Sequence, residues 1–241
     1  MDIEVWSDFI CPFCYIGKRR LELALDQFPH KKKVAVTYNS YELDPNAERN
    51  PGKSIHELMA EKFGMSVDEA RKSNEELGRQ ANELGLTYNF DTMQHTNTFD
   101  AHRVAQYAKN KGKEHAVTER LLRAYFTDSE RISDHDTLAR LAAEAGLDRG
   151  NVRALLKRDD YADDVRIDEK EAAQLGVQGV PFFVFNSKYA LSGAQPLDVF
   201  KEVLEKVWEE EQSEPSLQSL TPKKSKTTYC TDEGCKIEED D

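Results

Sequence analysis

The chain has 241 residues, of which 39% are hydrophobic and 32% charged, a balance typical of a globular protein with one large or two small domains. Its net charge of −12 argues against a nucleic-acid partner, because phosphates are bound mainly by Lys and Arg. No apolar run approaches the roughly 20 residues of a membrane span, and the N-terminus carries no secretory signal pattern. We therefore expect no membrane association and a cytoplasmic location.

The first predicted element is a strand that leads into a pair of cysteines. Apolar residues alternate with polar ones over residues 2–7, and the sequence CPFC follows, with Cys11 and Cys14 at its ends. A helical pattern comes next, and Pro12 fits the first helical position. Cys11 is thus expected to be the N-cap, with its sulfur facing free backbone N–H groups that favour the reactive thiolate. Cys14 should lie close enough to form a disulfide with Cys11.

The C-x-x-C spacing is also half of a common zinc site. Zinc sites usually have a second ligand pair nearby, whereas the next cysteine here, Cys230, lies about 200 residues further on. A C-x-x-C motif beside an α/β pattern favours redox chemistry. The sequence therefore predicts that Cys11 attacks, that Cys14 resolves, and that no metal is bound.

The remaining pattern predicts an α/β frame that is interrupted by helices. A second strand is predicted at 33–41, followed by a polar loop at 42–52. Amphipathic patterns then predict helices at 54–63, 66–84, 97–111, 113–127, 134–145, 148–157 and 160–175. Strands at 180–185, beginning near Pro181, and at 189–192 precede a last helix that starts at Pro196.

This order predicts a thioredoxin fold with a large all-helical insertion after the second strand. The expected domains are a discontinuous thioredoxin-like domain at 1–52 and 160–212, a helical insertion at 53–159, and a tail at 213–241.

The tail contains a second cysteine pair, Cys230 and Cys235. A segment from about residue 212 to 229 could extend roughly 3.3 Å per residue, far enough to bring this pair back to Cys11. Three interpretations stay open: a second redox-active pair that exchanges electrons with the first, a metal-binding or regulatory clip, and an inert tail.

Three stretches together resemble a known family. VWSDFICPFCYIGKRRLE near the N-terminus, NTFDAHRVAQYA at 97–108 and GVQGVPFFVFNSKYALSGAQP at 176–196 are similar to the DsbA-family thioredoxin-fold oxidoreductases, and most similar to their cytoplasmic FrnE-type branch. The resemblance covers residues 1 to about 212. It implies a cis Val180–Pro181 bond that faces the cysteines, with the Val180 backbone pairing to a substrate chain.

The function implied is thiol–disulfide exchange, as an oxidoreductase or isomerase, with protein or small disulfide and thiol substrates and no cofactor. Pro181 joins the two cysteines as a catalytic element, and Pro12, Phe13, Val180 and His102 are expected to form the substrate groove. For His102 the alternative is a structural role. Phe13 stands where periplasmic DsbA proteins have histidine, which argues against a strongly oxidising character.

Two other functions remain as alternatives. Glutathione-dependent enzymes of the kappa-class transferase and 2-hydroxychromene-2-carboxylate isomerase type also resemble the sequence, but they typically have serine where Cys11 stands and lack the second cysteine. The other alternative is a thiol metal-binding protein or a partner scaffold.

Overall fold

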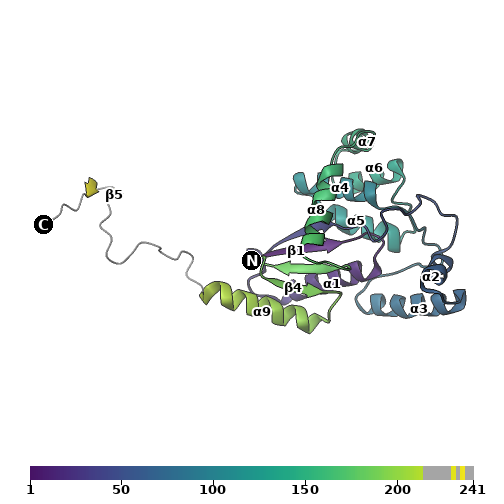
Figure 1. Cartoon of the computed structure of the whole chain (residues 1–241), viewed down its shortest axis with the longest axis horizontal. Coiled ribbons are helices and arrows are strands. Elements are labelled where there is room, and N and C mark those ends of the chain that lie inside the picture. Colours follow the sequence, from purple (N-terminus) through teal and green to yellow (C-terminus); the bar gives the residue numbers. More distant parts are fainter. Residues whose placement is uncertain (214–228, 232–233, 237–241) are drawn as a thin grey trace.

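A mixed four-stranded sheet lies at the centre of the computed structural model, which describes residues 1–213, 229–231 and 234–236 (Figure 1). Its strands are β1 (Asp2–Ser7), β2 (Ala35–Ser40), β3 (Phe182–Phe185) and β4 (Tyr189–Ser192). They lie in the order β2-β1-β3-β4, with β1 parallel to β2 and antiparallel to β3, and with β3 antiparallel to β4. The two central strands therefore come from opposite ends of the sequence.

All the predicted helices are present in the structure. They are α1 (Pro12–Gln27), α2 (Ile55–Phe63), α3 (Val67–Glu83), α4 (Phe99–Asn110), α5 (Glu114–Phe126), α6 (His135–Glu144), α7 (Arg149–Leu156), α8 (Ala162–Gln174) and α9 (Leu197–Ser213), with a short 3-10 turn at Lys31–Lys33. The predicted ranges were slightly longer partly because they included the caps. Ser54 and Ser66, for example, are N-caps whose side chains accept from the backbone of Glu57 and Glu69 in reciprocal capping boxes.

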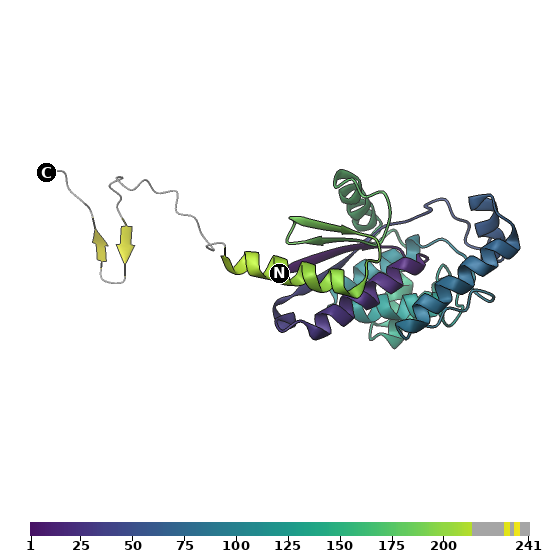
Figure 2. The same cartoon turned by 90° about the horizontal axis from the view of Figure 1, so that it is seen from below.

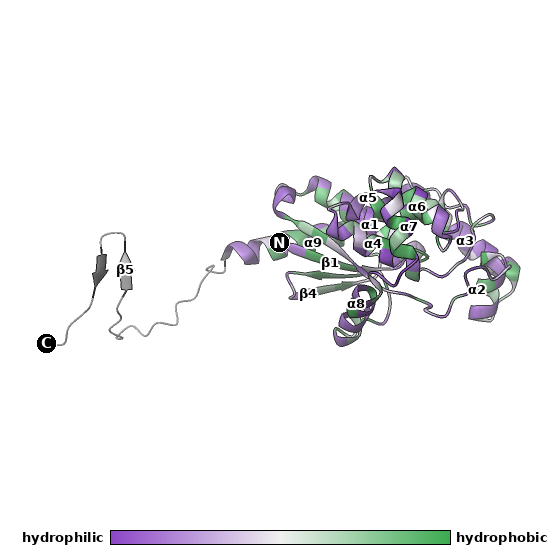
Figure 3. Ribbon diagram, turned by 90° about the horizontal axis from the view of Figure 1, so that it is seen from above, coloured by the Kyte–Doolittle hydropathy of each residue, from purple (hydrophilic) through white to green (hydrophobic). Residues whose placement is uncertain are grey.

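Helices cover both faces of the sheet. Helices α1 and α9 pack side by side on one face, and α8 lies on the other (Figures 2 and 3). Phe183, Phe185 and Phe200 are fully buried in the core on the α1 and α9 side. On the α8 side the fully buried Trp6 packs with Ala172, and its indole N–H donates to a backbone carbonyl of α8 at 3.0 Å.

The insertion between β2 and α8 comprises α2 to α7 and has a core of its own. This core includes the fully buried Phe126 and Leu121, and it also contains Phe9, Tyr15 and Ile16 from the segment around the cysteines. The insertion is thus packed directly on the start of α1. The predicted fold, a thioredoxin frame with a helical insertion after the second strand, is confirmed. The domain boundaries proposed from the sequence stay a prediction.

Two further points concern the C-terminal half. Strand β3 begins at Phe182, so Pro181 precedes the strand instead of opening it. Strands β5 (Tyr229–Thr231) and β6 (Gly234–Lys236) form an antiparallel pair with Cys230 opposite Cys235. In the described part of the chain, no helix combines the length and the apolar character needed to cross a membrane.

Candidate active site

Cys11 lies where a helix begins, as predicted. It is the N-cap of α1 in an extended conformation, Pro12 is the first helical residue, and the backbone N–H of Cys14 donates to the Cys11 carbonyl at 3.0 Å. The Cys11 sulfur, however, makes no capping hydrogen bond. It lies 3.4 Å from the carbonyl oxygen of Val180, to which the thiol donates. A thiol is a hydrogen-bond donor and therefore contacts an acceptor here; the predicted effect of the helix N–H groups on the Cys11 thiolate stays a prediction.

The Val180–Pro181 peptide bond is cis, as the resemblance implied. The loop is held against α1 at Gly17, where a Cβ atom would lie 2.9 Å from Pro181 Cγ and 3.1 Å from Phe183 Cζ. On its other side, the backbone N–H of Gly193 donates to the Pro181 carbonyl at 2.8 Å. These contacts fix the Val180 carbonyl opposite the Cys11 sulfur.

Both cysteines are buried, and Cys14 is the less exposed of the two, at 2% against 4% for Cys11. Both are free thiols. Burial raises the pKa of its thiol well above the ordinary value, and the neighbouring Cys11 raises it further by hydrogen bonding and charge. The Ser7 side chain and the backbone N–H of Asp8, which donates to the Cys14 sulfur at 3.5 Å, act in the opposite direction. Cys14 is therefore protonated in the reduced protein at neutral pH.

A buried hydrogen-bonded pair, Asp8 and His102, lies beneath the cysteines. Asp8 is fully buried, and its Oδ1 accepts from Nε2 of His102 at 3.2 Å while its Oδ2 accepts from the backbone N–H of Leu43 at 2.8 Å. His102 is 3% exposed and packs on Phe9 with ring centroids 4.8 Å apart. The structure thus places His102 in the interior, apart from Pro12, Phe13 and Val180. The sequence analysis missed Asp8, although a carboxylate between a buried strand and the cysteine pair is itself an unusual pattern.

Tyr88, which was also not identified from the sequence, lies in the insertion and hydrogen-bonds to the start of α1. Its hydroxyl donates to the Pro12 carbonyl at 2.8 Å, and its ring stacks on Phe126 with centroids 4.5 Å apart. Burial, followed by the charge of Cys11, raises the pKa of Tyr88. The hydroxyl consequently stays a donor, and the cysteine helix is tied to the insertion.

A large cleft opens beside Cys11, between the CPFC segment and helices α2 and α3. Its volume is about 870 Å³, within the size range of ligand sites. Pro12, Phe13 and Val180 line it together with apolar side chains of α2 and α3. Phe13, Leu43 and Phe63 are 48%, 41% and 60% exposed, an unusual degree for large apolar side chains. The cleft therefore offers an apolar surface next to Cys11, the member of the cysteine pair that lines it.

Polar side chains also line the cleft, among them Ser73, Asn74 and Gln80. The Nδ1 atom of His95 and the hydroxyl of Tyr125 are buried in its lining, without a hydrogen-bond partner among the described residues. Burial lowers the pKa of His95, so its ring is neutral at neutral pH. Four charged residues line the cleft, and three of them are carboxylates: Asp44, Glu61 and Glu76 against Lys62. The cleft thus suits an apolar ligand with hydrogen-bonding groups better than an anion.

Two further points of the sequence analysis concern a possible metal site and the cysteine pair of the tail. Within residues 1–213, no three or more His, Cys, Asp and Glu side chains are grouped as a metal site. The side chains of Cys230 and Cys235 fall outside the described part of the chain, so the three interpretations of the tail stay predictions.

Comparisons with known proteins agree with this architecture. The family model of the DSBA-like thioredoxin domain matches residues 2–205. The uncharacterized protein YwbO of Bacillus subtilis is 30% identical over 207 residues, which are 84% of this chain and 94% of that protein. The crystal structure of a probable DsbA oxidoreductase from Streptomyces coelicolor has a TM-score of 0.87 and 39% identity, covering 99% of this chain and 100% of that one. The cytosolic disulfide reductase DsbM of Pseudomonas aeruginosa shares the fold, with a TM-score of 0.61 and 15% identity over 87% of this chain and 99% of its own.

Proposed function

Because the chain belongs to the DSBA-like thioredoxin domain family, we propose that it is a thiol–disulfide oxidoreductase or isomerase that acts on polypeptide disulfides through Cys11 and Cys14. The observation that carries the proposal is the different setting of the two thiols. Both thiols are buried, but Cys11 lines the cleft and contacts the Val180 carbonyl, whereas Cys14 does not line the cleft and has a raised pKa. This asymmetry suits one thiol that attacks a substrate and one that resolves the product.

The reaction proceeds in two exchanges. The Cys11 thiolate attacks one sulfur of the substrate disulfide, and the other substrate sulfur leaves as a thiolate. Cys14 then loses its proton and attacks the Cys11 sulfur, which releases the second substrate thiol and leaves a Cys11–Cys14 disulfide. Two electrons pass to the substrate, and the reverse sequence oxidises a dithiol. Once Cys11 is in a disulfide, the Val180 carbonyl loses its thiol donor and becomes available to a backbone N–H of the substrate.

The cleft supports a polypeptide as the substrate. Exposed Phe13, Leu43 and Phe63 match apolar side chains of an unfolded segment. The polar side chains of Ser73 and Gln80, which also line the cleft, can hydrogen-bond to its peptide groups. The glutathione-dependent alternative is less well supported. Glutathione carries two carboxylates, and three of the four charged residues in the cleft are themselves acidic.

The proposal extends to the tail, the branch of the family and the location. Cys230 and Cys235 would act as a second redox pair that exchanges with Cys11, because they are cross-strand neighbours in the β5–β6 pair and therefore spaced for a disulfide. The FrnE-type motifs at 97–108 and 176–196 support membership of the cytoplasmic branch. Cell fractionation would test the location.

The central test is turnover of a protein disulfide by variants of the full chain. Insulin reduction driven by dithiothreitol should be lost in Cys11→Ser. Cys14→Ser should accumulate a mixed disulfide with the substrate that mass spectrometry detects on Cys11. Retention of turnover in Cys11→Ser would refute the proposal.

The tail relay needs a separate experiment. In mildly oxidised Cys14→Ser protein, peptide mapping should find a link from Cys11 to Cys230 or Cys235 at concentrations too low for dimers. If no link forms, and truncation at about residue 212 leaves turnover unchanged, the tail pair is not part of the mechanism.

A further inference from the structure

The turn between β1 and α1 contacts both cysteines through one residue, Asp8. The backbone N–H of Asp8 donates to the Cys14 sulfur at 3.5 Å, and its carbonyl accepts from the Cys11 N–H at 3.2 Å. Strand β1 ends at Ser7, so the pairing of the strands does not fix the Asp8 backbone. Other contacts must therefore hold this N–H on the sulfur.

The side chain of Asp8 supplies these contacts. Its carboxylate is fully buried and accepts two hydrogen bonds, one from Nε2 of His102 at 3.2 Å and one from the Leu43 backbone N–H at 2.8 Å. The two donors bind different oxygen atoms, so together they fix the orientation of the carboxylate as well as its position. The backbone of Asp8 is thus held in place through its own side chain.

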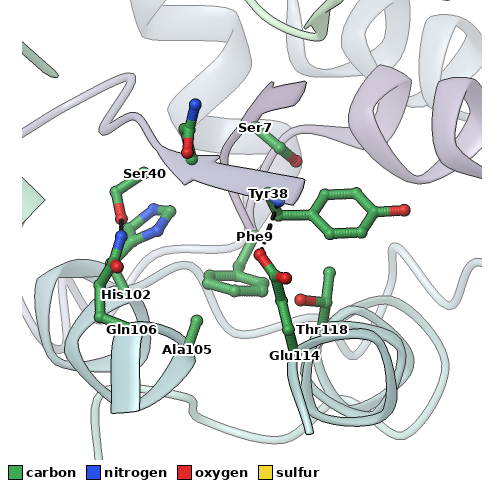
Figure 4. A pocket seen from close by; sticks show the side chains of 10 residues that line it. Ser7, Phe9, Tyr38, Ser40, His102, Ala105, Gln106, Glu114 and Thr118 are labelled. Carbon is green, nitrogen blue, oxygen red and sulfur yellow. Dashed lines mark hydrogen bonds between the residues drawn. The ribbon is translucent and has the colours of Figure 1, made fainter. Parts of the chain in front are cut away.

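The helix that carries His102 is itself firmly attached to the sheet. His102 is 3% exposed on α4, and its ring packs on Phe9. One turn further along α4, the Gln106 amide donates to the hydroxyl of Ser40 at the end of β2, at 2.9 Å (Figure 4). His102 therefore offers Asp8 a fixed partner, anchored to the same sheet from which the turn begins.

We propose that Asp8, held by His102 and the Leu43 N–H, is a positioning residue for the resolving step. It keeps a backbone N–H on the Cys14 sulfur, where negative charge develops before Cys14 attacks the Cys11 sulfur. The proposal rests on the proposed function and adds no reactant to the two exchanges described there. His102 acts through Asp8 and is likewise a positioning residue.

The resolving step needs such a donor because Cys14 is buried. At 2% exposure, water can do little to solvate a charge on this sulfur. A hydrogen bond to a thiolate is stronger than one to a neutral thiol, so the Asp8 N–H stabilises the attacking form more than the resting one. Burial raises the pKa of Cys14, and Ser7 and the Asp8 N–H oppose this effect.

Loss of the anchor should affect the two cysteines unequally. The Cys11 sulfur keeps its contact with the Val180 carbonyl at 3.4 Å, and the adjacent Pro12 carbonyl keeps its hydrogen bond from Tyr88 at 2.8 Å. The Cys14 sulfur, in contrast, depends on the Asp8 N–H. The second exchange should therefore slow more than the first.

The experiment separates the two exchanges in the full chain, with Cys230 and Cys235 replaced by Ser so that only the active-site pair reacts. Reduced protein is mixed with 4,4′-dithiodipyridine at neutral pH. One thiopyridone is released when Cys11 attacks, and a second when Cys14 resolves.

Three variants on α4 distinguish positioning from stability. His102→Leu removes the donor to the Asp8 carboxylate. His102→Gln is the conservative variant, because its side-chain amide can supply an N–H in place of the ring Nε2. Val104 is fully buried on the same helix, so Val104→Ala measures the effect of lost stability alone. Urea unfolding of each variant shows how much stability it has lost.

The expected result is a selective loss of the second release. In His102→Leu it should slow roughly tenfold, less than the complete loss of such a donor costs, while the first release changes by less than about twofold. His102→Gln should recover most of the rate, and Val104→Ala should keep it despite lower stability. An unchanged second release in folded His102→Leu would overturn the proposal, as would equal slowing in Val104→Ala or no recovery in His102→Gln.

A second variant covers the case in which His102→Leu does not fold. Combining Asp8→Ala with His102→Leu leaves no unpaired buried carboxylate, so it is less destabilising but still removes the anchor. The same selective slowing is expected, and an unchanged second release would again overturn the role of Asp8. A wild type that releases only one thiopyridone would instead contradict the proposed function.

Discussion

Gly17 gives the sharpest test of how the Val180–Pro181 loop is held at the cysteines. In Gly17→Ala the new Cβ would lie 2.9 Å from Pro181 Cγ, 3.1 Å from Phe183 Cζ and 3.5 Å from Ala194 Cβ. The first distance is shorter than carbon atoms tolerate, and the Pro181 ring is part of a loop with little freedom to retreat. The loop, and with it the Val180 carbonyl, must move away from α1.

The magnitude follows from two opposing effects. Replacing Gly by Ala inside a helix stabilises by about 0.5–1 kcal/mol, whereas adding a methyl group to a well-packed core costs about 1–3 kcal/mol. Gly17→Ala should therefore lower the free energy of unfolding by about 1 kcal/mol. The Cys11–Val180 contact of 3.4 Å should also be disturbed, and kcat/KM should fall roughly three- to tenfold.

Gly78 provides a matched control in α3. A Cβ there would lie 3.9 Å from Phe90 Cε2, an ordinary contact, so Gly78→Ala should stabilise by about 0.5–1 kcal/mol. The two variants should then differ by about 2 kcal/mol, or about 4–8 °C in Tm. Thermal unfolding and insulin reduction measure both effects. If Gly17→Ala is as stable as Gly78→Ala and fully active, the loop is not held by this contact.

Two more predictions concern the cleft and the insertion. Phe63→Ser should raise KM for a polypeptide disulfide at least threefold and leave the reaction with a small disulfide unchanged. Ile167 of α8 is equally exposed but lies outside the cleft, so Ile167→Ser is the control and should change neither reaction. Equal effects of the two variants would exclude the cleft as the substrate site. Burial alone would raise the pKa of Asp100, but hydrogen bonds from His135 and Arg103 lower it below the ordinary value of 3.8. The ionised carboxylate therefore stabilises the fold at pH values above 3.8. This contribution is lost as the pH falls through the lowered pKa of the folded protein. Asp100→Asn should cost about 3–5 kcal/mol in urea unfolding at neutral pH and progressively less below about pH 4; a difference independent of pH would contradict this account.

The structural features that depend on residues close together in the sequence could be predicted from it. Helix α3 begins at a Ser66–Glu69 capping box, and β4 ends where Gly193 adopts a positive φ, so local chemistry marks both boundaries. The N-cap position of Cys11 follows in the same way from Pro12. Such features need no knowledge of the remaining chain.

The features that were missed depend on distant segments. Asp8 is adjacent to the cysteine pair, but its partner His102 is 94 residues away, and nothing in the sequence joins the two. The cleft likewise requires α2 and α3 to stand beside residues 10–13, a placement set by the packing of the insertion on Phe9 and Ile16. The contact of the Cys11 sulfur with the Val180 carbonyl joins residues 169 positions apart, so the residues around Cys11 alone could not predict it.

That separation has a consequence for synthesis in the cell. Strand β1 pairs with β3 at the centre of the sheet, and Val180 precedes β3. At about 5–20 residues per second, a ribosome needs roughly 10–30 s to pass from Cys11 to Val180. Throughout that interval Cys11 and one edge of β1 remain uncovered, because the segment that contacts both has not yet been made. The order of elements therefore leaves Cys11 open to premature oxidation, and β1 open to mispairing, until β3 has been made.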